Sequence, residues 1–154
     1  MRRRWVAVGV LCLSLFAINV IARVITNVFN IENGDDQAKL VLYGMIATAV
    51  ILIAATAWWA ARYPFSRVFF DIGAAVVVAA FLSLIIGPLV GGATPFTEGL
   101  ATFVGEVLMF LAIAAVGFFL GFAGMMTFGR DYKSKRLRNY EQTYNRRPRR
   151  PVRG

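Results

Sequence analysis

The chain has 154 residues, 58% of them hydrophobic, and its 17 Lys and Arg against eight Asp and Glu give a formal net charge of +9. Soluble domains are about 45–50% apolar, so this composition argues against an ordinary soluble domain and favours a membrane protein. The chain has no histidine and one cysteine, Cys12, which excludes an internal disulfide, histidine-anchored haem, Ser-His catalysis and histidine-based zinc sites.

Four apolar segments are long enough to cross a bilayer, since a spanning helix needs roughly 20 apolar residues. The expected spans are residues 5–28, 40–61, 69–90 and 100–128. Pro88 is expected to kink or end the third span. Short connections make consecutive helices antiparallel neighbours. The sequence therefore predicts an all-α membrane protein, a compact up-down bundle of four transmembrane helices in residues 1–129, followed by a basic cytoplasmic tail in residues 130–154.

The charges outside the spans are distributed unevenly. Lys and Arg gather at the N-terminus, in residues 62–67 and in the tail, whereas acids fall in residues 32–39 and 91–99. Lys and Arg in short loops stay on the cytoplasmic side of a membrane, so both termini are expected to lie inside. The short loops and Arg-rich ends favour a multi-pass protein of the bacterial cytoplasmic (inner) membrane.

Small residues recur every three or four positions along the last two predicted spans. Such spacing places them on one helical face, where backbones can approach closely inside lipid. The favoured interpretation is that the two rows pack against each other within the bundle. The alternative is an oligomer or partner interface centred on Gly117 and Gly121. Together they form the candidate packing face: Ala75, Ala79, Ser83, Gly87, Ala114, Gly117, Gly121 and Gly124.

Three polar residues lie near the outer ends of the first and fourth spans. Arg23 follows the apolar core of the first span, Glu106 precedes that of the fourth, and Asn19 lies one helical turn before Arg23. With the longer span boundaries, both charges lie at similar depth on helices that can touch. The favoured interpretation is that each charge stays at the interface, with Glu106 as a first-turn acid. The alternative, which needs the longer boundaries, is an intramembrane Arg23–Glu106 ion pair joined by Asn19.

One acid lies at the inner boundary of the third span. Asp71 is expected to cap the N-terminus of that helix and to pair with Arg67, four residues earlier. An ionisable residue inside a membrane would be a functional candidate, whereas an interfacial helix cap is structural.

The tail carries clustered positive charge. Lys133, Lys135, Arg136 and Arg138 follow the last span among aromatic residues, which predicts a helix lying at the membrane surface. Basic clusters just inside a span attract anionic lipid, so these four are the candidate lipid contacts. The Arg- and Pro-rich segment 146–153 is expected to be disordered. Nucleic acid or an acidic protein is the less favoured partner.

No enzyme signature accompanies these features. No second aspartate lies near Asp71 to form the pair that a membrane aspartyl protease needs, and no phosphate-binding glycine loop is present. We therefore expect a non-catalytic integral membrane protein without cofactor or metal. It would be a scaffold, assembly or regulatory subunit of a membrane complex, or a homo-oligomer. The alternative is a small proton- or cation-coupled transporter or channel that uses Glu106 with Arg23.

Overall fold

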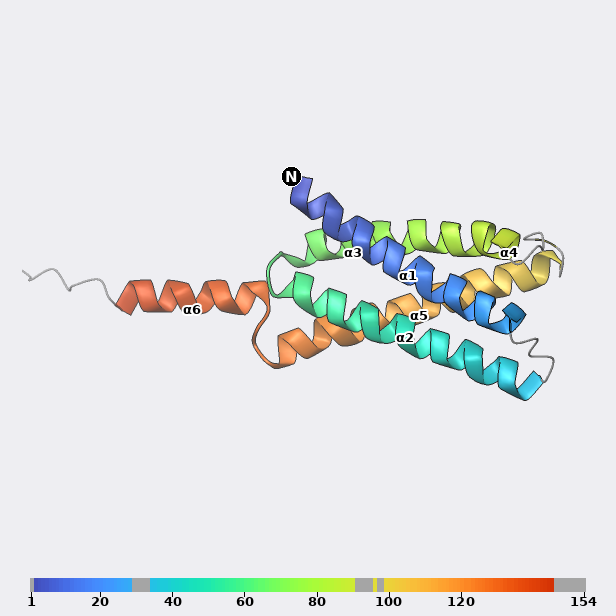
Figure 1. Cartoon of the computed structure of the whole chain (residues 1–154). Coiled ribbons are helices and arrows are strands. Elements are labelled where there is room, and N and C mark those ends of the chain that lie inside the picture. Colours follow the sequence, from blue (N-terminus) through green and yellow to red (C-terminus); the bar gives the residue numbers. More distant parts are fainter. Residues whose placement is uncertain (1, 29–33, 91–95, 97–98, 146–154) are drawn as a thin grey trace, which may run out of the picture.

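The computed structural model describes residues 2–28, 34–90, 96 and 99–145, with backbone only for residues 2, 3, 27, 87, 90 and 145. The elements are α1 (Arg2–Val28), α2 (Gly34–Ala60), α3 (Phe65–Phe81), the π-helix η1 (Leu82–Ile86), α4 (Gly87–Val90), α5 (Leu100–Thr127) and α6 (Tyr132–Asn145) (Figure 1). Among the described residues there is no strand, so the expected all-α class is confirmed.

Four helices are long and apolar enough to cross a membrane, which confirms the expected number of spans. They are Arg4–Thr26 within α1, Gly34–Ala60, Phe65–Ile86, which runs from α3 through η1, and Leu100–Tyr144, of which α5 is the apolar part. Large apolar side chains such as Phe70 and Phe119 point outward from them, exposed by 72% and 64%. Exposed apolar surface of this extent is typical of a lipid-facing or partner-facing protein.

Two helix ends follow directly from local sequence. α3 begins at Phe65 because Pro64 precedes it in an extended conformation, with φ −66° and ψ 153°. Beyond α5, Gly129 adopts a φ of +58°, a left-handed conformation that favours glycine. The N–H of Gly129 donates to Met126 O at 2.9 Å, and the N–H of Arg130 donates to Met125 O at 3.0 Å. This pair of bonds is a Schellman motif and ends α5 before the tail.

The third span changes its winding near its end. Residues 82–86 form the π-helix η1, and α4 continues from Gly87. Pro88 has no N–H to donate to the carbonyl of Leu84, and its ring would crowd that carbonyl in a regular α-helix. A wider π turn relieves this conflict, so the helix continues past the proline with altered geometry.

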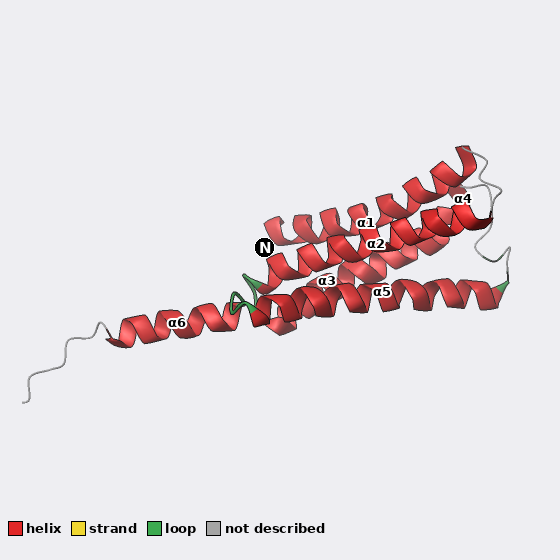
Figure 2. Ribbon diagram, turned by 90° about the horizontal axis from the view of Figure 1, so that it is seen from below, coloured by secondary structure: helices red, strands yellow, loops and turns green. Residues whose placement is uncertain are grey.

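The long helices run back and forth along one axis (Figures 1 and 2). The N-terminus and α6 lie at one end of the molecule, here called the α6 end. α1 and the third span finish at the opposite end, here called the far end. α2 packs along α5, and α1 packs along α3 and α2. The largest of the fully buried apolar side chains come from α1, α2 and α3: Leu15, Leu52, Val68 and Ile72.

Two glycines of α5 allow its backbone to approach α2. A Cβ atom at Gly117 would lie 2.8 Å from Leu52 Cβ, and one at Gly121 would lie 2.6 Å from the carbonyl oxygen of Ile53. No side chain fits at such distances, so the close packing depends on the missing Cβ atoms. The partner of the α5 row is therefore α2, which differs from the expected packing against the third span.

The other members of the candidate packing face behave differently from one another. A Cβ at Gly124 would meet nothing within 4 Å, so Gly124 does not belong to the close contact. The surroundings of Gly87 lie outside the part of the chain whose side chains are described. The remaining four are buried within the chain: Ala75, Ala79, Ser83 and Ala114. Their burial leaves them unavailable to a partner.

Asp71 binds to another helix rather than to its own. Because α3 begins at Phe65, Asp71 lies inside the helix and Pro64 holds the cap position. Arg4 of α1 donates from Nε to Asp71 Oδ2 at 2.8 Å and from Nη2 to Asp71 Oδ1. The Asp71 side chain is only 3% exposed, and a buried carboxylate requires such a charged partner. The expected cap and the expected pairing with Arg67 are wrong.

α6 projects away from the bundle, roughly along its axis (Figures 1 and 2). Asp131 caps this helix by accepting from the N–H of Lys133 at 3.1 Å. Lys135 Nζ donates to the carbonyl of Ala61, just beyond α2, at 3.1 Å. The tail thus begins as a helix, as expected, but it does not fold across the end of the bundle. The segment 146–153, expected to be disordered, lies outside the described residues.

Candidate functional site

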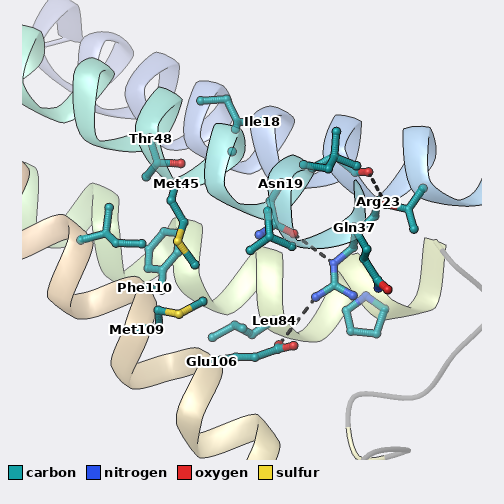
Figure 3. A pocket seen from close by; sticks show the side chains of 17 residues that line it. Ile18, Asn19, Arg23, Gln37, Met45, Thr48, Leu84, Glu106, Met109 and Phe110 are labelled. Atoms are coloured by element: carbon teal, nitrogen blue, oxygen red, sulfur yellow. Dashed lines mark hydrogen bonds and ion pairs between the residues drawn. The ribbon is translucent and has the colours of Figure 1, made fainter. Parts of the chain in front are cut away.

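A pocket of about 460 Å³ lies in the far half of the molecule (Figure 3). Its walls come from α1, α2, α5 and the end of the third span. Asn19, Arg23 and Glu106, the polar residues that the sequence singled out, all line it. Ligand pockets of proteins typically measure roughly 300–1,000 Å³, so this one has the size of a small-molecule or lipid site.

The charged centre of the pocket joins α1 to α5. Arg23 Nη2 lies 3.6 Å from Glu106 Oε2, and Arg23 Nε donates to Asn19 Oδ1 at 3.1 Å (Figure 3). The structure therefore brings these three residues together. A separation of 3.6 Å gives electrostatic attraction without a hydrogen bond. The Glu106 carboxylate keeps its acceptor capacity, and the guanidinium, which has five N–H donors, keeps most of its own.

The pocket changes character along the bundle axis. Thr26 near the end of α1 and Gln37 near the start of α2 lie toward the far end, together with Arg23, Glu106 and the apolar Pro88. The deeper walls are mainly apolar: Ile18, Met45, Leu84, Met109, Phe110 and Ile113. A site that is polar at one end and apolar at the other fits an amphipathic ligand.

The pocket exists because α2 and α5 are close in one place and apart in another. The glycine contacts at Gly117 and Gly121 hold the two helices together. Beyond that contact the two helices diverge toward the far end (Figures 1 and 2). Larger side chains such as Met45 and Phe110 lie between them there and only partly fill the space. On another wall, a Cβ at Gly44 of α2 would touch Ala22 Cβ at 3.9 Å, so α1 and α2 stay close.

The other charge pair between helices, Arg4 with Asp71, has a structural rather than a ligand-binding geometry. Arg4 binds both carboxylate oxygens of Asp71, which leaves the carboxylate satisfied. Sequence reasoning missed this link between α1 and α3. The sequence feature that could have indicated this link is the spacing of Asp71, Ala75 and Ala79, because it places the acid on the buried face of the helix. An acid on such a face needs a cation from a neighbouring helix.

The other polar groups among the described residues form no metal-ligand cluster, and three of them are buried without a partner. No group of three or more His, Cys, Asp or Glu that could hold a metal ion is found there. Three buried side-chain atoms have no hydrogen-bond partner in the described part: Thr56 Oγ1, Trp59 Nε1 and Ser83 Oγ. They come from α2 and η1 and do not line the pocket.

The candidate lipid contacts are all on α6. All four side chains are exposed: Lys133, Lys135, Arg136 and Arg138. Two of them also hold α6 in place, because Lys135 binds the Ala61 carbonyl and Arg138 Nη2 donates to the Gly129 carbonyl at 3.3 Å. Their positive charge therefore lies just beyond the α6 end of the spans.

No known protein family's model matches this chain, and no curated protein and no solved structure matches it either. A functional proposal for this chain therefore rests on its own structure: the pocket, the buried contacts and the exposed surface of α6.

Proposed function

We propose that this chain is a non-catalytic integral membrane protein that serves as a scaffold, assembly or regulatory subunit of a membrane complex. It would cross a bacterial cytoplasmic membrane four times as a compact up-down bundle, with both termini inside. The distribution of Lys and Arg supports that orientation, because they cluster at the N-terminus, at the α2–α3 connection and on α6. The four candidate spans support the multi-pass placement.

The observation that carries this proposal is an exposed apolar stripe on α6. Leu137, Tyr140 and Tyr144 are exposed by 60%, 74% and 74%, and their spacing of three and four places them on one helical face. We call these three residues the α6 stripe. Because α6 projects from the bundle, nothing in the described chain covers it. Such a face, bordered by basic residues, suits the groove or helix of an acidic cytoplasmic partner protein.

A variant of the stripe tests the proposal. The tagged full chain is purified from its membrane in mild detergent, and the mass of the particle is compared with that of the variant L137A/Y140A/Y144A. We expect the native chain to elute within a larger complex and the variant to elute as a smaller particle. The matched control is N139A/Q142A, which alters the opposite face of the same helix and should leave the complex intact.

Two results would contradict the scaffold. One is a native chain that is a monodisperse monomer when extracted under these conditions. The other is a complex that survives unchanged in the stripe variant. The small residues of the third and fourth spans are a weaker candidate than the α6 stripe for a partner interface. Most of them are already buried within the chain.

The second candidate is a proton- or cation-coupled carrier, favoured by the location of Glu106 in the wall of the pocket. Its side chain is 42% exposed and faces Arg23, so protonation or cation binding there would alter the contact between α1 and α5. In proteoliposomes, E106Q should abolish coupled uptake while E141Q, on α6, should not. Full transport by E106Q would reject this candidate.

A further inference from the structure

The far-end pocket presents one cation and one anion side by side. Among the described residues that line it, the charged ones are Arg23 and Glu106, whose formal charges cancel. A purely anionic ligand would place a second negative charge beside Glu106, and a purely cationic one would place a second positive charge beside Arg23. Charge complementarity therefore favours a ligand that carries both signs.

The Arg23 guanidinium and the Glu106 carboxylate each favour a particular kind of ligand group. A guanidinium offers several N–H donors in a planar fork, an arrangement that matches the oxygens of a phosphate. The Glu106 carboxylate makes no hydrogen bond to Arg23 across 3.6 Å, so it can accept N–H donors from a ligand. A primary ammonium supplies such donors, whereas a quaternary ammonium has none.

The depth of the charges matches the level of lipid headgroups. Arg23 follows Arg4 by 19 positions in α1, a rise of about 28 Å along a helix. The hydrocarbon core of a bilayer is about 30 Å thick, so a helix with Arg4 at one boundary has Arg23 near the other. The apolar walls of the pocket then lie within the hydrocarbon, below the two charges.

The pocket also reaches the outside of the bundle. Val41 of α2 and Met109 of α5 both line it and are exposed by 46% and 44%. A chain entering between these helices would pass from surrounding lipid to the deeper wall formed by Met45 and Phe110. A lateral opening of this kind admits a lipid, whose second chain can stay in the bilayer.

We propose that this pocket binds a zwitterionic phospholipid with a primary ammonium headgroup. Its phosphate would bind Arg23, its ammonium would bind Glu106, and one acyl chain would lie against Met45, Met109 and Phe110. The inference goes beyond the scaffold proposal and is independent of the α6 stripe, because it uses residues at the opposite end of the molecule.

The test uses the delipidated full chain in detergent and native mass spectrometry. Phosphatidylethanolamine, phosphatidylcholine and phosphatidylglycerol with identical acyl chains are added separately. We expect one phosphatidylethanolamine per chain, retained about tenfold better than the other two lipids, since hydrogen bonds to charged groups are worth roughly a factor of ten or more. The wild-type comparison needs no variant and so does not depend on how well a mutant folds.

Variants then locate the binding. R23Q and E106Q should each lower retention of phosphatidylethanolamine about tenfold, with R67Q and E141Q as matched controls on exposed positions outside the pocket. Stronger retention of phosphatidylglycerol, equal retention of the three lipids, or a preference that survives both pocket variants would each overturn the proposal. Loss of the complex that depends on the α6 stripe would leave lipid retention unchanged. The scaffold proposal and the lipid proposal can therefore be rejected independently of each other.

Discussion

Among the described glycines, Gly121 leaves the least room for a side chain, because its backbone lies against α2. Its missing Cβ would lie 2.6 Å from the Ile53 carbonyl oxygen and 2.9 Å from Thr56 Cβ. A carbonyl oxygen within a helix cannot move aside as a flexible side chain can. Gly124, one turn further along α5, faces open space. The two glycines therefore form a matched pair in which only one has a packing role.

We predict that G121A lowers the free energy of unfolding by about 1–3 kcal/mol, the usual cost of overpacking a close contact. G124A should be neutral or should stabilise by about 0.5–1 kcal/mol, because alanine is a better helix former than glycine. Thermal unfolding of both variants in the same detergent measures the difference. Equal effects of the two substitutions would contradict the role assigned to Gly121.

At the other charge pair, Asp71 has Arg4 as its partner among the described side chains. Arg4 supplies both hydrogen bonds to its nearly buried carboxylate. Removing Arg4 leaves the buried Asp71 carboxylate unpaired, which is more harmful than replacing both residues by apolar groups.

We therefore expect D71N and R4Q each to lower the unfolding temperature by several degrees. The double variant R4L/D71L should recover most of that loss, because it removes both charges at once. R67Q is the control, since Arg67 is exposed on the same helix. An unchanged unfolding temperature in D71N would show that the pair does not hold α1 to α3.

At the scale of elements, α6 stands apart from the other helices. It has no apolar core of its own, and its start is fixed by a Schellman motif, by the Lys135–Ala61 bond and by the Asp131 cap. Asp131 lies past the end of α5, outside the spanning helix. The Ser134 hydroxyl, together with the backbone N–H groups of Ser134 and Lys133, holds the pKa of Asp131 below its ordinary value of 3.8.

The cap gives α6 a pH dependence of defined sign. The pKa of Asp131 is lower in the folded state than in the unfolded state. The stabilisation that the cap gives α6 is therefore complete above pH 3.8, and it is lost as the pH falls through the folded-state pKa. We expect D131A to cost α6 about 1 kcal/mol at neutral pH. Hydrogen exchange of the α6 amides should be faster in D131A than in N139A. Equal exchange in the two variants would contradict the cap.

At the scale of the whole molecule, the two ends differ in chemistry. The α6 end carries the basic residues of α6 and of the α2–α3 connection, whereas the far end carries Asp35, Asp36 and the pocket. The proposed orientation places the α6 end in the cytoplasm and opens the pocket toward the outer leaflet. The lipid proposal and the α6 proposal therefore concern opposite sides of the membrane.

Cysteine labelling checks that orientation. In a C12A background, D35C and S66C place single thiols at exposed positions of the far end and the α6 end. A membrane-impermeant maleimide applied to intact cells should label D35C and should label S66C only after permeabilisation. The reverse pattern would overturn the proposed N-in, C-in orientation.

Much of this architecture was predictable because bilayer thickness and hydrophobicity act on each segment locally. The lengths of the apolar runs predict four spans, and Pro64 and Gly129 mark helix ends through their own backbone preferences. The contact of Arg23 with Glu106 was one of two interpretations that the sequence left open, since both residues lie at the same end of spans that can meet.

What the sequence by itself determined is the helical class, the number of candidate spans and the helix ends marked by Pro64 and Gly129. Tertiary structure alone decided which helix faces meet: Gly117 and Gly121 against α2, and Asp71 against Arg4. It also opened the pocket, because that space depends on where α2 and α5 cross and diverge. The physical reason is that a helix periodicity marks a buried face without naming its partner, which only the packing of all helices together selects.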